Sequence, residues 1–365
     1  MSNGRIMFLR IAQVAPLYES VPPKLYGGTE RVVSYLTEEL VSQGHAVTLF
    51  ASGDSVTKSR LVPSTECALR LNPSSIDTLA HHILMLEQVF RRCEEFDVLH
   101  FHIDYLHFPL SRRLGCPTVT TLHGRLDFPD LVALYREFRD MPVISISNSQ
   151  RKPLPAAKWM ATVPHGLPAT LYTFSREAGR YLAFIGRISP EKRLDRAVEI
   201  AKRAGLPLKI AAKVDKVDAE YFRHKIEPLL HSPLVEYVGE INEREKDAFF
   251  GNAYALLFPI DWEEPFGLVM IEALACGTPV IAFDRGSVPE VIQDGVTGFI
   301  VKDVAGAVKA VDRIPQLSRA TCRRTFELRF AADRMAREYV DVYRQLILDK
   351  KPVFGQEREW NRPVM

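Results

Sequence analysis

The chain of 365 residues is poor in cysteine and in long apolar runs. Its five cysteines are an odd number and no two have the spacing of a metal site or a redox pair, so we expect a reduced, cytoplasmic protein. The apolar start of the chain is interrupted by arginines and predicts a first strand rather than a signal peptide. No apolar run is long enough to span a bilayer, which leaves only peripheral contact with a membrane open.

An excess of charge of either sign is also missing. Lys and Arg number 47 against 45 Asp and Glu, a formal net charge of +2, so nucleic acid is not expected as a partner. Two nucleotide-binding signatures are absent as well. No Gly-x-Gly-x-x-Gly with a later acidic residue occurs, which disfavours an NAD-dependent dehydrogenase, and no Gly-Lys-Ser/Thr of a P-loop follows the early glycine pair.

What the chain does have is an alternation of apolar, β-rich segments with amphipathic helical ones, repeated in its two halves. The alternation predicts α/β domains whose parallel sheets are covered on both faces. A Pro- and Gly-containing stretch near 167–178 separates the halves, so we predict two Rossmann-like domains, 1–170 and 176–329. A last amphipathic helix, 330–365, has no strand after it. Ligands are expected at the carboxyl ends of the strands, in the cleft between the domains.

The stretch DWEEPFGLVMIEALACGTPVI places two glutamates on either side of an apolar helix start. Pro265 and Gly267 predict that the helix begins at Gly267 or Leu268, so Glu264 lies in the loop and Glu272 in the helix. Both can then face one pocket, with the phosphate-attracting helix N-terminus between them. This layout suggests a nucleotide sugar, with hydroxyl groups at its two ends and phosphates in the middle. The alternative is a pair of solvated surface glutamates.

Cations and glycines follow two other strands. FIGRISPEKR puts Arg187 and Lys192 after a strand, with a helix expected from about Pro190, and two cations there can neutralise a diphosphate. Gly27 and Gly28 precede the first helix, where glycines let backbone N–H groups approach a ligand. The alternative for Arg187 and Lys192 is that they are solvated basic residues, and the alternative for Gly27 and Gly28 is a flexible loop.

Three more strand ends carry candidates. His123 can donate a hydrogen bond to a sugar hydroxyl or transfer a proton, and the alternative is a capping histidine. His102 and Asp104 can line the acceptor side, while His100, on the same face of its strand as His102, can be structural. Gly239 ends a strand in VEYVGE, where a base could rest against the backbone.

In this order along the chain, the motifs resemble those of the family 4 glycosyltransferases, which have the GT-B fold of two Rossmann-like domains facing each other across a deep cleft. The resemblance covers nearly the full length. Its most specific element is E-x7-E, here EPFGLVMIE, followed by ALACGTPVIA; GRISPEK, the early GG, VLH and LHG also stand in the expected places.

The resemblance implies a role for each matching residue. Glu272 would bind the ribose hydroxyls of a nucleotide-sugar donor, and Arg187 and Lys192 would hold its diphosphate and stabilise the leaving group. Gly28 would approach the diphosphate from the first domain, and His123 would sit by the donor sugar near the reaction centre. Contacts to the donor sugar and phosphates are implied for Glu264, Phe266, Gly267 and Leu268. The final helix would cross back onto the first domain.

The implied reaction is hexose transfer to a hydroxyl acceptor with retention of configuration, without metal or cofactor. The donor is expected to resemble UDP-glucose, with GDP-mannose as a competitor. A sugar, a lipid-linked and a small-molecule acceptor all stay open, as does the oligomeric state. Three positions depart from the family pattern: Arg193 replaces a usual glycine, Ala211–Ala212 a usual Ala-Gly, and His165 a common asparagine. Alternatives are a sugar phosphorylase, a nucleotide-sugar epimerase or a non-catalytic sugar-nucleotide-binding partner.

Overall fold

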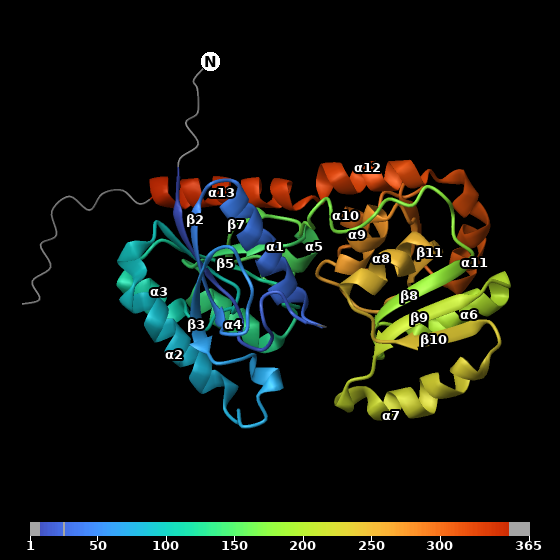
Figure 1. The fold of residues 1–365 in the computed structure, drawn as a ribbon, viewed down its shortest axis with the longest axis horizontal. Helices are drawn as coiled ribbons and strands as arrows, with labels where there is room; N and C mark the ends of the chain where they lie inside the picture. Colours follow the sequence, from blue (N-terminus) through green and yellow to red (C-terminus); the bar gives the residue numbers. More distant parts are fainter. Residues whose placement is uncertain (1–7, 25, 350–365) are drawn as a thin grey trace, which may run out of the picture.

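The computed structural model describes residues 8–24 and 26–349. These residues form two separate parallel β-sheets, both flanked by helices, which lie side by side with their helical layers (Figure 1). The α/β class expected from the alternation of apolar segments is therefore confirmed. Part of the expected C-terminal helix, residues 350–365, lies outside the described residues.

The first sheet has seven strands in the order β3-β2-β1-β4-β5-β6-β7. Their bounds are Arg10–Val14 (β1), Ala46–Ser52 (β2), Arg60–Thr65 (β3), Val98–Phe101 (β4), Thr118–Thr121 (β5), Pro142–Ser145 (β6) and Lys158–Thr162 (β7). The central strands are buried, while the edge strands β3 and β7 are only partly covered. The order of strands reverses between β1 and β4, so the loops after these two strands diverge and leave a crevice.

The second sheet has six strands in the order β10-β9-β8-β11-β12-β13. Their bounds are Tyr181–Arg187 (β8), Leu208–Lys213 (β9), Val235–Gly239 (β10), Ala253–Phe258 (β11), Val280–Phe283 (β12) and Gly298–Val301 (β13). Here the order reverses between β8 and β11. The two sheets thus repeat one topology, and each offers a crevice at the carboxyl end of its first strand.

Helices connect the strands in both halves. Those of the first half are Gly28–Ser42 (α1), Thr78–Arg91 (α2), Phe108–Leu114 (α3), Pro129–Glu137 (α4) and Asn148–Arg151 (α5). Those that follow are Leu194–Ala204 (α6), Ala219–Tyr221 (α7), Glu243–Gly251 (α8), Leu268–Ala275 (α9), Val288–Val291 (α10), Val304–Arg313 (α11), Arg319–Arg329 (α12) and Ala332–Asp349 (α13).

One predicted helix start is wrong. Helix α6 begins at Leu194 rather than near Pro190. The backbone of Arg193 has a left-handed φ of 55°, and the Lys192 N–H donates to the Ser189 carbonyl, so this segment forms a turn before the helix. Residues 219–231 also form no continuous α-helix, because they divide into α7, a π-helical turn and a 3₁₀ turn.

The last helix belongs to the layer over the first sheet. Along α13 the buried side chains recur every three or four residues, which gives the helix one apolar face. Met335, Tyr339 and Tyr343 on this face pack in one core with Val32 and Leu36 of α1. Figure 1 shows α12 over the second half and α13 over the first, so the chain returns to its first half at its end.

The chain therefore passes between the halves twice, once between β7 and β8 and once between α12 and α13. The two passages meet. The Leu167 N–H donates to the Phe330 carbonyl at 2.9 Å, and the Ala332 N–H donates to the Leu167 carbonyl at 2.8 Å. Leu167 and Ala331 form an isolated parallel β-bridge, so the two connections are tied at a single point.

Candidate active site

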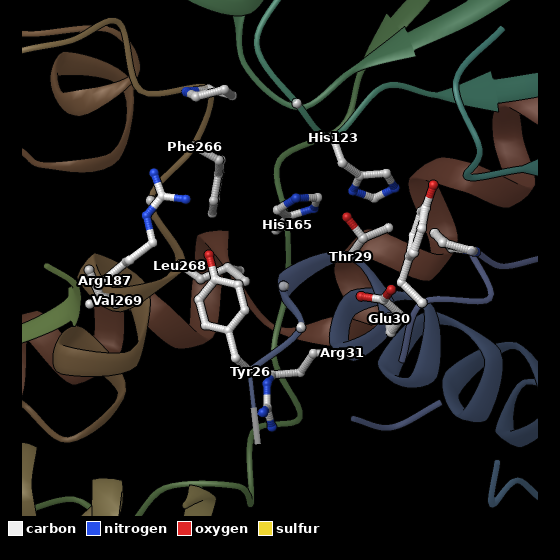
Figure 2. A pocket seen from close by; sticks show the side chains of 18 of the residues that line it. Tyr26, Thr29, Glu30, Arg31, His123, His165, Arg187, Phe266, Leu268 and Val269 are labelled. Atoms are coloured by element: carbon white, nitrogen blue, oxygen red, sulfur yellow. The ribbon is translucent and has the colours of Figure 1, made fainter. Parts of the chain in front are cut away.

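A cavity of about 730 Å³ lies between the two sheets, where the crevices of both halves face each other (Figure 2). Its walls come from the loops after β1, β4, β5, β8, β9 and β10 and from the starts of α1 and α9. Of the predicted site residues, the cavity is lined by Gly27, Gly28, His102, Asp104, His123, Arg187, Lys192, Glu264, Phe266, Gly267, Leu268 and Glu272. Gly239 is not among the lining residues, although Glu240 and Ile241 are.

The two glutamates of the E-x7-E segment both reach this cavity. Helix α9 begins at Leu268 as predicted, because Gly267 before it has a left-handed φ of 80° and lets the chain turn. Glu264 in the preceding loop is 9% exposed and Glu272 in the helix is 1% exposed. The alternative of two solvated surface glutamates is therefore wrong.

Glu272 belongs to a cluster of charges at one end of the cavity. Its Oε1 accepts from the Lys246 Nζ at 2.9 Å, while its buried Oε2 has no partner among the described residues. The Lys246 Nζ is also 3.9 Å from the Glu243 Oε2. Arg31 of α1 pairs with Glu243 at the start of α8, so this cluster links the two halves. A carboxylate oxygen without a partner can accept a hydrogen bond from a ligand.

Glu264, at the other end of the E-x7-E segment, is held by two side chains. The Lys192 ammonium contacts the Glu264 Oε2, and the Trp262 indole N–H donates to the same oxygen at 3.0 Å. Lys192 also lies 4.9 Å from the centre of the Trp262 ring, a cation–π distance. The carboxylate and the aromatic ring together fix the ammonium group at the cavity wall.

Arg187 ends β8 and projects into the cavity from the second half (Figure 2). Three carboxylates surround its guanidinium: Glu191 accepts a hydrogen bond, and Asp218 and Asp215 lie 3.4 and 3.8 Å away. These carboxylates orient the guanidinium, and its side chain keeps 33% of its surface exposed.

The early glycine pair brings the first half close to the second. Gly28 is the first residue of α1, and a Cβ built on it would approach Leu268 of α9 at 3.8 Å. A Cβ on Gly27 would meet the Pro23 ring at 2.8 Å, so this position is closed to larger residues. The starts of α1 and α9 therefore face each other across the cavity, and both direct free N–H groups towards their N-terminal ends.

His123 follows β5 and stands above the start of α1 in Figure 2. Its Nε2 is 2.9 Å from His102 Nδ1, and its ring stacks on that of His165, with centroids 5.3 Å apart. Burial lowers the pKa of His123 to about 3, so the ring is uncharged at neutral pH. His100 bonds to Tyr343 and is buried away from the cavity, which is the structural role that the sequence left open for it.

Sequence reasoning missed Arg31, Lys246 and His165 as lining residues. Arg31 offered a signal, because a cation in the first turn of a helix opposes the helix dipole and needs another reason to be there. Lys246 offered none, since a lysine in an amphipathic helix is usually solvated. His165 is one of the three departures from the family pattern, and it packs its ring edge-on against Phe266 at 4.9 Å.

Within residues 8–24 and 26–349 no group of three or more His, Cys, Asp or Glu side chains could hold a metal ion. None of the helices in the same part of the chain is long and apolar enough to cross a membrane.

Comparison with protein families gives two matches that follow one another along the chain. Residues 26–183 match the model of Glycosyltransferase Family 4, and residues 173–325 match that of Glycosyl transferases group 1. The chain is a family 4-like glycosyltransferase. The resemblance found in its motifs is therefore confirmed, and so is the class of its activity.

Known proteins similar to this glycosyltransferase include several enzymes. O-antigen chain mannosyltransferase C of Escherichia coli is 23% identical over an alignment that covers 93% of this chain and 100% of that protein. Sucrose-phosphate synthase of Thermosynechococcus elongatus has a TM-score of 0.78 at 19% identity, covering 93% of this chain and 100% of the other. Anabaena HepE, solved with UDP and glucose, has a TM-score of 0.72 at 15% identity, with coverage of 92% and 100%. The structural likenesses confirm the GT-B fold.

Proposed function

We propose that this glycosyltransferase moves a hexose from a nucleotide-diphosphate sugar to a hydroxyl acceptor, with retention of configuration and without a metal. One observation supports this most. A single cavity holds two buried carboxylates on either side of the start of α9, together with the cations Arg187, Lys192 and Lys246. A ligand with hydroxyl groups at both ends and a diphosphate in its middle complements such a cavity.

The proposed roles follow from the contacts of each group. The unpartnered Oε2 of Glu272 would accept from a ribose hydroxyl, while Lys246 fixes the other oxygen of the same carboxylate. Arg187 and Lys192 would hold the diphosphate from the second half, and Gly28 would approach it from the first. Glu264, Phe266, Gly267 and Leu268 would surround the donor sugar and its phosphates.

The reaction step needs stabilisation of a leaving diphosphate. As the bond between the anomeric carbon and the diphosphate oxygen breaks, negative charge grows on that oxygen, where the two cations and the start of α9 would stabilise it. The acceptor oxygen would attack the anomeric carbon from the same face, and its proton would pass to the leaving phosphate oxygen. No separate base and no metal is needed in this scheme.

The expected donor is UDP-glucose or a close relative, with GDP-mannose as the competitor. The first is supported by the UDP and glucose in the solved HepE complex, and the second by the mannosyltransferase of Escherichia coli. The acceptor is a sugar, a lipid-linked molecule or a small molecule that carries a free hydroxyl.

Peripheral contact with a membrane is part of the proposal. Helix α2 leaves Leu79, Ile83 and Leu84 between 52% and 60% exposed, while His82 on its other face lines the cavity. An apolar helix face next to the acceptor side supports a membrane-borne acceptor.

The donor is tested by thermal unfolding with UDP-glucose, GDP-mannose, UDP and GDP, each with EDTA present. A ligand that binds only the native state stabilises it by about 2.7 kcal/mol at one hundred times its dissociation constant, which raises the melting temperature. We expect the uridine or the guanosine pair to stabilise the protein and the other pair to do so less. Failure of all four ligands contradicts the donor proposal, and stabilisation only when Mg²⁺ replaces EDTA contradicts metal independence.

A further inference from the structure

A buried chain of hydrogen bonds runs from α13 through the first sheet to the cavity. Tyr343 of α13 contacts Gln13 of β1, whose Nε2 is 3.1 Å from the tyrosine hydroxyl. The Oε1 of Gln13 is 2.7 Å from His102 Nε2, and His102 Nδ1 is 2.9 Å from His123 Nε2. Gln13 and Tyr343 are fully buried, and the chain ends at His123 on the cavity wall.

The orientation of the Gln13 amide decides which partner donates in each hydrogen bond of this series. Its Nε2 side faces two groups that can accept, the Tyr343 hydroxyl and His100 Nδ1 at 3.4 Å, while its Oε1 side faces His102. An NH₂ group has two protons to donate. One goes to the Tyr343 hydroxyl, and the other faces His100 Nδ1, a nitrogen that also contacts the Tyr343 hydroxyl at 2.7 Å. The reverse orientation would leave one N–H of a fully buried amide without a partner, which is costly.

The tautomers of the histidines follow from that orientation. Because Gln13 Oε1 can only accept, His102 must carry its proton on Nε2, and its Nδ1 is then a lone pair. His123 must therefore donate from Nε2 to His102, which leaves the Nδ1 of His123 without a proton. That Nδ1 is buried and has no partner among the described residues.

We propose that Gln13, backed by Tyr343, is a positioning residue that holds His123 in its Nε2–H tautomer, so that His123 meets its ligand as a hydrogen-bond acceptor. An acceptor nitrogen selects a hydroxyl and repels a phosphate oxygen. Resting on the proposed function, this tautomer assigns His123 to a hydroxyl of the hexose rather than to the diphosphate. It excludes the other role that the sequence left open, in which His123 donates a hydrogen bond to a sugar hydroxyl. The depressed pKa of His123 agrees, since the ring stays neutral.

The tautomer is read directly by two-bond ¹H–¹⁵N correlation spectra of ¹⁵N-histidine-labelled protein without any ligand, with His123 assigned by the signals missing from His123→Gln. We expect the pattern of an Nε2–H ring for His123. An Nδ1–H pattern would overturn the proposal. Because no donor is added, this outcome does not depend on whether the proposed reaction is correct.

A pair of variants tests the part played by Gln13. Gln13→Met removes the amide, so His123 is expected to populate both tautomers and the dissociation constant of UDP-glucose to rise about two- to tenfold. Thr120→Val is the matched control, because Thr120 is equally buried and bonds His107 at 2.6 Å, outside this chain. The control should keep the Nε2–H pattern. If His123 keeps a single, unchanged tautomer in Gln13→Met, or if Thr120→Val shows the same mixture of tautomers as Gln13→Met, the role of Gln13 is contradicted. The wild-type spectrum decides the tautomer of His123 even if a variant does not fold.

Discussion

At the scale of single residues, the site is organised by charges that already have partners inside the protein. Glu264 contacts Lys192, Glu272 is bonded to Lys246, and Arg187 lies among three carboxylates. Pairs of this kind keep buried charges compensated and hold each side chain in one orientation. The protein thereby presents preorganised groups, which lowers the cost of ordering them on a ligand.

Glu272→Ala is expected to raise the dissociation constant of the nucleotide sugar about ten- to a hundredfold, since a hydrogen bond to a charged group contributes about 1.5–3 kcal/mol. Isothermal calorimetry with the donor found by thermal unfolding measures this. Glu263→Ala is the control, because that carboxylate accepts from the Gly286 N–H at 2.9 Å and does not line the cavity. Equal affinities for Glu272→Ala and the wild type would rule out the ribose role.

The sequence was enough to place Glu264 and Glu272 on either side of a helix start, because Pro265 and Gly267 mark that start. Their selection as ligand-binding residues rested on the resemblance to the E-x7-E motif. The sequence was not enough to find Arg31 and Lys246. Their importance depends on contacts with Glu243 and Glu272 that only folding brings together, across distances in the chain that no local pattern records.

At the scale of elements, the buried central strands of the first sheet were predictable and its edge strands β3 and β7 were not. β1 and β4 are buried except for Arg10 and are mostly apolar, whereas every residue of β3 and β7 is partly covered or exposed and both strands carry polar side chains. An edge strand packs on fewer neighbours and so leaves a weaker apolar pattern in the sequence. The late start of α6 escaped prediction for another reason, because it depends on the left-handed backbone of Arg193.

Helix α2 carries the prediction for membrane contact. Replacing both Ile83 and Leu84 by glutamate should abolish cosedimentation with vesicles of phosphatidylethanolamine and phosphatidylglycerol, because each charge opposes burial in the interface. Leu328→Glu on α12 is the control, since Leu328 is 67% exposed on the other half of the molecule. Wild-type protein that stays in the supernatant, or a double variant that still sediments, would contradict peripheral binding through α2.

At the scale of the whole molecule, the first half buries an unusual number of neutral imidazoles. Burial lowers the pKa of seven of them: His45, His82, His100, His102, His107, His123 and His165. Unfolded, each has a pKa near 6.5. The unfolded state therefore binds more protons below pH 6.5, and stability is full above that pH and lost as the pH falls towards 3.

We expect the free energy of unfolding to be flat above about pH 7 and to drop between pH 6.5 and 4, by at most about 1.4 kcal/mol per pH unit for each ring. Asp104, whose pKa burial raises to about 6, opposes this trend, as do Glu30 and Asp218, whose pKa values burial also raises. Urea unfolding at pH 7.5, 6 and 5 measures the slope. His165→Asn should reduce it, and equal stability at all three pH values would show that the rings do not stay neutral in the folded state.

The tie between Leu167 and Ala331 has a mechanical consequence. A single tether would let the two halves swivel and slide, and two separate tethers would allow only bending about the line that joins them. Here both passages of the chain are hydrogen-bonded at one place beside the cleft, between β7 and β8 on one side and α12 and α13 on the other. They act as one hinge, about which we expect the two halves to rotate. The ion pair between Arg31 of the first half and Glu243 of the second is one of the contacts that such a rotation would break as the cavity opens.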